Sequence, residues 1–288
     1  MNYVLIFIGY MPEYINYLVN SILSVDKDAE IFICYQKNYK LSFKNVKHVF
    51  LEDIESMNLD RFNDLKVYEN TIFESNPLWN TSAQRIFYLQ QIIKELDLKN
   101  VIHFDNDVVI YKPFADNVDS FNKDKFNITP YNNKKLIFGY SYLEKMSILD
   151  FVCESYLDIC SDGKESGWLT NNNKPLTEME VLKKIEINNE DLFNLLPTQP
   201  YEGKTIFDPA GYGQYLDGTH ANPKKLGRKG FISNNDSIGI EIRTKRINVK
   251  FNKSPIITWE GDKYGLSNLH VHSKRLVKFL PTNYKNFL

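Results

Sequence analysis

Two aspartates one residue apart, Asp105 and Asp107, are the side chains of this sequence best suited to chemistry. They lie between two apolar runs, Val101–Phe104 and Val108–Tyr111. Short apolar runs are typical of buried strands, and open α/β sheets bind ligands at the carboxyl ends of their strands. Paired carboxylates at such an edge, outside the core, can hold one hard divalent cation and leave positions for phosphate or water. The motif therefore predicts metal-assisted binding of a diphosphate.

A second group of candidate ligands lies near the C-terminus, in the segment Asn268–Lys274. His270 and His272 alternate along a short predicted strand, so both side chains belong to one face, and Lys274 follows at the strand end. A neutral imidazole is a natural further ligand for a carboxylate-held cation, and an ammonium group suits a leaving diphosphate. We expect one histidine to be a ligand and the other to be its neighbour. The alternative is a histidine pair satisfied by surface hydrogen bonds.

A third segment, Phe207–Thr219, is rich in glycine. Asp208 is suited to capping a helix, and Gly211 and Gly213 would let the backbone approach a ligand closely. A helix cap with glycines needed only for packing remains the alternative.

The elements that position these motifs alternate between strand and helix in the first half of the chain. We predict strands at Tyr3–Ile8, Ile31–Tyr35, Val46–Leu51 and Val101–Phe104, and helices at Pro12–Val25 and Thr81–Leu96. This order predicts a mostly parallel sheet with helices on both faces. In the second half we predict helices at Tyr142–Ile159 and Glu178–Ile185, a polar loop at Ser161–Lys174, and a hairpin of strands Ile238–Ile242 and Ile247–Phe251.

Composition limits the functional classes. The 35 basic and 36 acidic residues nearly balance, so the chain has no global electrostatic case for binding nucleic acid. The 3 cysteines are scattered and predict a reducing compartment. No apolar stretch is long enough to cross a membrane, and no basic leader precedes the first strand. We expect a cytoplasmic protein with at most peripheral contact with the inner face of a membrane, for which the basic run Arg243–Arg246 is a candidate.

The segment Val101–Phe114 resembles the D-x-D signature of GT-A-fold glycosyltransferases that use nucleotide sugars. It is most similar to the retaining glycogenin and bacterial lipooligosaccharide galactosyltransferase type, and the similarity extends from about Asn80 to Phe114. The resemblance implies an α/β, GT-A-like single domain over residues 1–288. Residues 1–114 would be its nucleotide-sugar-binding half. Residues 115–288 would be its acceptor-binding half and carry the C-terminal metal and phosphate segment.

The resemblance also implies roles for the charged motifs. In this family the second aspartate binds Mn²⁺ or Mg²⁺ directly and the first contacts metal and ribose, which are the roles implied for Asp107 and Asp105. A late histidine on the metal and a nearby lysine on the phosphates correspond to His270 or His272 and to Lys274. The family's H-x-x-G-x-x-K spacing is absent here. We favour His270 as the metal ligand, because its spacing to Lys274 is closer to the family's spacing than that of His272.

The glycine-rich segment resembles the family's D-Q-D-x-L-N segment, whose first aspartate bonds the donor sugar. Asp208 falls on that aspartate, whereas Ala210 and Gly213 replace the second aspartate and the asparagine. Gln214 and Asp217 are further catalytic candidates from this segment. The resemblance implies retaining hexosyl transfer. An inverting mechanism would need a carboxylate base, for which Asp217 or Asp208 is the candidate.

Donor and acceptor contacts are expected from other segments. The donor would be a nucleoside-diphosphate sugar, with a UDP-sugar favoured, and the acceptor a glycan or glycolipid. Trp259 and Tyr264 could offer an acceptor platform, or pack simply against each other. Tyr10 and Arg85 are both predicted to contact the donor. The alternative for Tyr10 is simple packing, and the alternative for Arg85 is an ordinary surface charge. Besides Asp105 and Lys274, the residues predicted to bind the donor are Ile8, Gly9, Tyr10, Tyr14, Arg85 and Asn106.

Two other functional classes remain open. A phosphohydrolase of the haloacid-dehalogenase type also has D-x-D after a strand, and would use Asp105 as its nucleophile. In that class the motif ends the first strand, whereas three predicted strands precede it here. That class also needs a later acidic pair for Mg²⁺, and the nearest such pair in this sequence is Glu260 and Asp262. The non-enzyme alternative is a catalytically silent sugar-nucleotide-binding module. The main hypothesis is a metal-dependent glycosyltransferase that moves a sugar from a nucleoside-diphosphate sugar to a hydroxyl acceptor.

Overall fold

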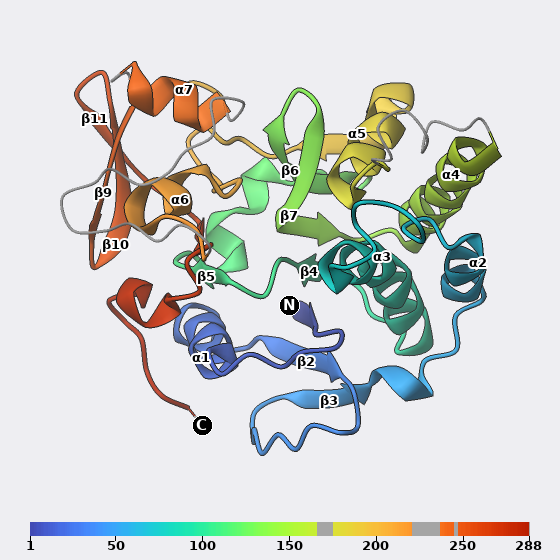
Figure 1. The fold of residues 1–288 in the computed structure, drawn as a ribbon. Coiled ribbons are helices and arrows are strands. Elements are labelled where there is room, and N and C mark those ends of the chain that lie inside the picture. Colours follow the sequence, from blue (N-terminus) through green and yellow to red (C-terminus); the bar gives the residue numbers. More distant parts are fainter. Residues whose placement is uncertain (166–174, 221–236, 245–246, 288) are drawn as a thin grey trace.

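A computed structural model describes residues 1–165, 175–220, 237–244 and 247–287 of the chain. Its central element is a seven-stranded sheet in the order β3-β2-β1-β4-β7-β6-β8 (Figure 1). The strands are β1 (Asn2–Ile6), β2 (Glu30–Tyr35), β3 (Lys47–Phe50), β4 (Val101–His103), β6 (Phe126–Asn132), β7 (Lys135–Leu143) and β8 (Phe193–Leu195). Strands β3, β2, β1 and β4 are parallel, β7 is antiparallel to β4 and β6, and β8 is parallel to β6. The predicted α/β class with a mostly parallel sheet is confirmed.

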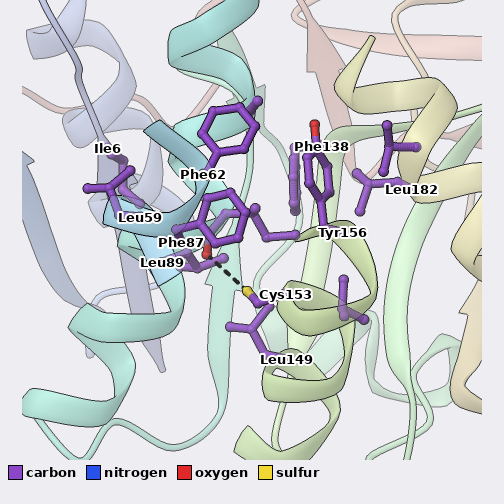
Figure 2. Close-up of a cluster of buried hydrophobic side chains, with 14 of the residues drawn as sticks. Ile6, Leu59, Phe62, Phe87, Leu89, Phe138, Leu149, Cys153, Tyr156 and Leu182 are labelled. Atoms are coloured by element: carbon purple, nitrogen blue, oxygen red, sulfur yellow. Dashed lines mark hydrogen bonds between the residues drawn. The ribbon is translucent and has the colours of Figure 1, made fainter. Parts of the chain in front are cut away.

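Strand alternation divides the core between the two faces of this sheet. Tyr3 and Leu5 of β1 pack with helix α1 in one buried cluster. Val4 and Ile6 belong to a second cluster, with side chains from helices α2 to α5 (Figure 2). The helices are α1 (Ile15–Val25), α2 (Met57–Leu65), α3 (Pro77–Glu95), α4 (Met146–Glu165) and α5 (Glu178–Asn188). Successive side chains of a strand point to opposite faces, so helices cover both faces as predicted.

Local sequence sets where α3 and α5, the helices that carry Arg85 and Glu178, begin. Helix α3 has Asn76 as its N-cap, whose side chain accepts a hydrogen bond from the Leu78 N–H, and Pro77 occupies the first turn. Helix α5 begins with a capping box formed by Thr177 and Glu180. The capping box of α5 places Glu178 in the first turn of that helix.

A smaller two-stranded sheet joins distant parts of the chain. Strand β5 (Val108–Ile110) follows the D-x-D motif and pairs antiparallel with β12 (Asn268–His270). Helix α6 (Gly211–Asp217) lies beside β12. Helix α7 (Ser237–Arg243) lies beside α6 and next to the antiparallel sheet of β9 (Ile247–Asn252), β10 (Ser254–Trp259) and β11 (Asp262–Gly265) (Figure 1). Short 3₁₀ helices cover Leu51–Asp53, Phe114–Asp116, Val118–Ser120, Glu190–Leu192 and Leu276–Phe279.

The prediction of a strand at Ile238–Ile242 was wrong, because these residues form part of α7. Ile238 and Ile242 are buried, whereas Ile240 is 49% exposed. Residues four apart share one face of a helix, so this apolar pattern also fits a helical turn. Strand β9 pairs instead with β10, which in turn pairs with β11.

Several predicted boundaries also differ. Helix α4 begins at Met146 rather than Tyr142, because Tyr142 pairs in β7 with Ile102 and Asn127. Helix α1 begins at Ile15 and α3 already at Pro77. Residues 166–174 of the predicted polar loop, and Lys245 and Arg246 of the basic run, lie outside the described residues. Within the described ranges, no helix combines the length and the apolarity needed to span a bilayer. The division into halves at residue 114 stays a prediction.

Candidate active site

The D-x-D motif forms a turn between β4 and β5. The Asp105 N–H donates to the Phe138 carbonyl of β7 at 2.6 Å, and the Val108 N–H donates to the Asp105 carbonyl at 3.2 Å. The Asp107 carbonyl accepts from the Val271 N–H at 2.7 Å. Asp107 is only 3% exposed, so the expectation that its side chain lies outside the core was wrong. The cause is the C-terminal segment, which pairs along β5 and covers the motif.

His270 and Lys274 both contact the Asp107 carboxylate. His270 Nε2 lies 3.0 Å from Asp107 Oδ1, and Lys274 Nζ lies 2.6 Å from Oδ2. His270 Nε2 is also 3.6 Å from Asp105 Oδ2. The structure therefore brings the two motifs together, as predicted from sequence.

These contacts control the charges of the cluster. Burial opposes ionisation, yet His270 and Lys274 hold the pKa of Asp107 well below its ordinary value. Burial likewise opposes protonation of His270, but the neighbouring Asp107 carboxylate raises its pKa. Burial, with the nearby His270, lowers the pKa of His272 to about 4. His272 is thus a neutral imidazole near pH 7, the form that binds metals.

The three donor side chains fit a divalent cation. Ligand atoms of Asp107, His270 and His272 all lie within 4.8 Å of one another, and no other such group occurs among the described residues. The two imidazole rings stack with centroids 4.4 Å apart. They do not alternate along one strand as predicted, because β12 ends at His270 and His272 lies in the turn that follows. His270 Nδ1 is buried and has no hydrogen-bond partner in the described structure. Imidazole and carboxylate groups are both common ligands of divalent metal ions. Which histidine ligates stays a prediction.

Asp208 caps helix α6 and holds strand β12 at the same time. Its carboxylate accepts hydrogen bonds from the N–H groups of Tyr212 at 3.0 Å, Gly213 at 2.9 Å and His270 at 3.0 Å. The side chain is fully buried, and burial raises its pKa to about 6. Asp208 is therefore a positioning residue for His270, and its contact with a donor sugar stays a prediction.

Gly213 serves packing in this structure. A Cβ atom at this position would lie 1.9 Å from the His270 carbonyl oxygen. Only glycine lets α6 approach β12 this closely, which is the packing alternative considered for the glycine-rich segment.

Asp217 and Gln214 are the other candidates on α6. Arg275 approaches the Asp217 carboxylate with Nε 2.7 Å from Oδ2 and Nη2 2.6 Å from Oδ1, and Ser273 Oγ donates at 2.7 Å. This bidentate contact leaves Asp217 poorly placed to act as a base. Gln214 is 7% exposed. The catalytic roles of both residues stay predictions.

Arg85 is buried between two carboxylates. Nη1 bonds Asp105, Nη2 lies 3.0 Å from Glu178 Oε1, and the guanidinium lies 4.9 Å from the centroid of the Phe138 ring. The side chain is 13% exposed, so the surface-charge alternative is wrong. Glu178 is a site residue that no sequence motif indicated. Its capping box was readable, but its contact with Arg85 across 93 residues was not.

The predicted base-binding residues lie on the turn after β1. Gly9 has φ +81°, and its N–H donates to Gln36 Oε1 at 3.0 Å while its carbonyl accepts from Tyr39 at 2.8 Å. Tyr10 is 68% exposed, and Ile8 is half-buried. Burial is the main cause that raises the pKa of the Tyr14 hydroxyl, and the nearby negative charge of Asp107 raises it further.

Asn106 connects that turn to the D-x-D motif. Its Nδ2 donates to the Ile6 carbonyl at 2.9 Å, at the end of β1. Its Oδ1 is buried without a partner in the described structure. The first turn and the D-x-D motif thus lie together at one edge of the sheet, where both were predicted. The ligand roles of these residues stay predictions.

Replacing Glu178 by glutamine should change the pH dependence of stability. Burial raises the pKa of Glu178 from its ordinary 4.5 to about 7. Between these values the folded protein holds a proton that the unfolded chain releases, so the free energy of unfolding falls as pH rises. Glu178→Gln should remove this pH dependence, which lowers the free energy of unfolding by roughly 3 kcal/mol between pH 4.5 and 7. Denaturant unfolding of both proteins across this range tests it, and parallel profiles would contradict it.

Comparison with known proteins gives a likeness at the level of solved structures only. No protein-family model and no curated protein sequence matches the chain. Mouse xyloside xylosyltransferase 1 shares 11% identity at a TM-score of 0.44, covering 68% of this chain and 86% of its own. The PaToxG glycosyltransferase shares 13% at 0.45, with 65% and 67% covered. The galactosyltransferase LgtC, with donor and acceptor sugar analogs, shares 12% at 0.41, with 69% and 74% covered. At these TM-scores the likeness does not by itself assign a function.

Proposed function

We propose that this chain is a metal-dependent glycosyltransferase of the GT-A type, which moves a sugar from a nucleoside-diphosphate sugar to a hydroxyl acceptor. The observation that carries the proposal is the convergence of Asp107, His270 and His272 within 4.8 Å, with Lys274 bonded to the same carboxylate. The D-x-D motif and the histidine segment are separated by more than half the chain, yet they meet at a sheet edge suited to ligands. The proposed donor is a UDP-sugar, and the proposed acceptor is a glycan or glycolipid.

The side chains of the site divide the work of binding the donor. Asp107, with His270 or His272 and with help from Asp105, would hold Mn²⁺ or Mg²⁺. Such a cation supplies positive charge against the diphosphate. Lys274 carries an ammonium group beside the same carboxylate, where it is placed to bind the leaving diphosphate.

Other residues of the chain hold this arrangement in place. Arg85 bonds Asp105 and Glu178, so it fixes the first aspartate instead of reaching freely into solvent. Asp208 holds the backbone of His270. Buried groups that bond the ligand residues in this way keep the ligands preorganised.

Retention of configuration is the proposed stereochemical outcome. An inverting enzyme needs a carboxylate base, and Asp208 and Asp217 were the candidates. Asp208 is occupied by three backbone N–H groups, and Asp217 by Arg275 and Ser273. Neither carboxylate is open to take a proton from an acceptor, which supports retention.

The phosphohydrolase alternative is not favoured. Glu260 and Asp262, its nearest acidic pair, are exposed residues at the turn of the β10–β11 hairpin. Asp105, its nucleophile, is bonded to Arg85 and lies beside an imidazole. An exposed acidic pair at a hairpin turn and a nucleophile already paired with Arg85 do not favour the phosphohydrolase mechanism.

Ligand-dependent stability and product release test the proposal together. UDP with Mn²⁺ should raise the Tm, because a ligand that binds only the folded state stabilises it. A screen of nucleotide sugars should then show nucleoside-diphosphate release that stops in EDTA and returns with Mn²⁺. No Tm shift from any nucleotide, together with fluoride-trapped phosphoryl mimics on Asp105, would favour the phosphohydrolase. Undiminished release in EDTA by metal-free protein would contradict the metal requirement.

A further inference from the structure

Helix α6 bonds the C-terminal segment at two places. Near the start of the helix, Asp208 accepts a hydrogen bond from the His270 N–H at 3.0 Å, and Gly213 lets the helix pack closely against β12. Asp217 is the last residue of the helix, and its side chain is buried. The two carboxylates therefore stand near opposite ends of α6, and both face the segment that carries the metal and phosphate candidates.

Asp217 bonds the residues on both sides of Lys274. Ser273 Oγ donates to Asp217 Oδ2 at 2.7 Å, and Arg275 Nε donates to the same oxygen at 2.7 Å. Arg275 Nη2 lies 2.6 Å from Asp217 Oδ1 and donates to the Asp217 carbonyl at 3.1 Å. Lys278 Nζ is 3.4 Å from Oδ1. One buried carboxylate thus anchors both sequence neighbours of Lys274 to the end of α6.

The side chain of Lys274 itself bonds a different carboxylate. Its Nζ lies 2.6 Å from Asp107 Oδ2, in the D-x-D motif. Three consecutive residues are thus divided between two buried carboxylates, which belong to segments far apart in the chain. The bonds to Asp217 fix the backbone before and after Lys274, and so fix the point from which the lysine side chain extends.

The backbone at Lys274 requires such anchoring. Lys274 has φ +63°, in the left-handed region that residues other than glycine rarely adopt. Its N–H donates to the Val271 carbonyl at 2.8 Å, which closes a turn after β12. A strained backbone of this kind persists only where the surrounding structure holds it. The bonds from Asp217 to both neighbours supply that constraint.

We propose that Asp217 is a positioning residue, which holds the turn at Lys274 so that the lysine ammonium lies at the Asp107 carboxylate. This role differs from that of a catalytic base, because the Asp217 carboxylate acts on the chain and not on an acceptor. The binding of a diphosphate by the positioned lysine rests on the proposed glycosyltransferase function. The positioning itself does not, because it is a property of the folded chain alone.

Amine labelling of the full chain tests the positioning. Sulfo-NHS-acetate in limiting amount acetylates lysines according to the accessibility of their amines, and peptide mass spectrometry reports each lysine separately. Asp217→Asn keeps the size of the side chain but removes the charge that pairs with Arg275. Lys274 should then be acetylated about fivefold faster or more, the effect of losing charge-assisted bonds that hold a turn. Lys250, exposed on β9, should be acetylated at the wild-type rate.

Arg275→Met breaks the same contact from the partner's side. The Arg275 side chain is 37% exposed, so this variant disturbs the core less than a change at Asp217. It should accelerate the acetylation of Lys274 in the same way. Circular dichroism and the Tm identify the folded variants. Wild-type labelling of Lys274 in either folded variant would overturn the proposal.

Calorimetric titration with UDP and Mn²⁺ tests what the positioned lysine does. Asp217→Asn should weaken UDP binding about tenfold, while Mn²⁺ affinity stays unchanged or rises, because the change acts on Lys274 and not on the metal-ligand candidates. In the Lys274→Met background the same change should alter UDP affinity less than about twofold, because two residues that act through one group are not additive.

The outcomes separate this inference from the proposed function. Faster labelling of Lys274 in the variants, with no UDP binding by the wild type, would uphold the positioning and reject the glycosyltransferase. UDP binding in which the effects of Asp217→Asn and Lys274→Met multiply would reject the positioning role. A loss of kcat in Asp217→Asn at unchanged UDP affinity and unchanged labelling would identify a catalytic base and reject it as well.

Discussion

Asp107→Asn should lower sugar transfer at least about 1,000-fold, which corresponds to roughly 4 kcal/mol of transition-state stabilisation. The carboxylate contacts His270 at 3.0 Å and Lys274 at 2.6 Å, and it is the candidate metal ligand at the centre of the site. Asparagine keeps the size of the side chain but removes the negative charge. The measurement is nucleoside-diphosphate release at saturating donor and Mn²⁺, together with Mn²⁺ binding by calorimetry.

The same substitution should also lower stability. Asp107 is 3% exposed, and removing one partner of a buried ionic contact costs about 3–5 kcal/mol when the other charges remain. We therefore prefer asparagine to alanine, which would add a cavity. Asp64→Asn, on the exposed side of α2, is the matched control and should change neither activity nor Tm. Activity of Asp107→Asn within tenfold of wild type would contradict the assigned site.

Lys274→Met should lower kcat by about 100- to 1,000-fold, the effect of removing one group that stabilises developing negative charge. Its ammonium lies 2.6 Å from Asp107 Oδ2 and competes with a cation for that oxygen. Methionine keeps an unbranched side chain without the charge. Mn²⁺ affinity should therefore stay unchanged or rise while turnover falls, which separates a phosphate-binding role from a metal-binding one.

Calorimetry with Mn²⁺ and steady-state kinetics measure the two effects on one preparation. Lys250→Met, at an exposed position of β9, is the control for loss of a lysine charge. A parallel loss of Mn²⁺ affinity and kcat in Lys274→Met would show that the lysine acts through the cation site. Unchanged kcat would remove it from the mechanism.

Local patterns in the sequence determined the parts of the site that depend on neighbouring residues. The apolar run before Asp105 predicted β4. The predicted strand through His272 ends at His270 instead, and the two histidine rings stack at the turn that follows it. Strand period and turn residues act over a few positions, so they can be read without the fold. The same short range explains the error at Ile238–Ile242, where one apolar pattern fits both a strand and a single helical turn.

Only the tertiary structure decided which segments meet. The pairing of β12 with β5 places His270 on Asp107, and the packing of α5 places Glu178 on Arg85. It also buried Asp107 and made Asp208 a cap for α6 that holds the His270 backbone. Such contacts depend on packing between segments far apart in the chain, which no local spacing encodes. The sequence determined the kinds of groups available for chemistry, and the fold determined which of them remain open to a substrate.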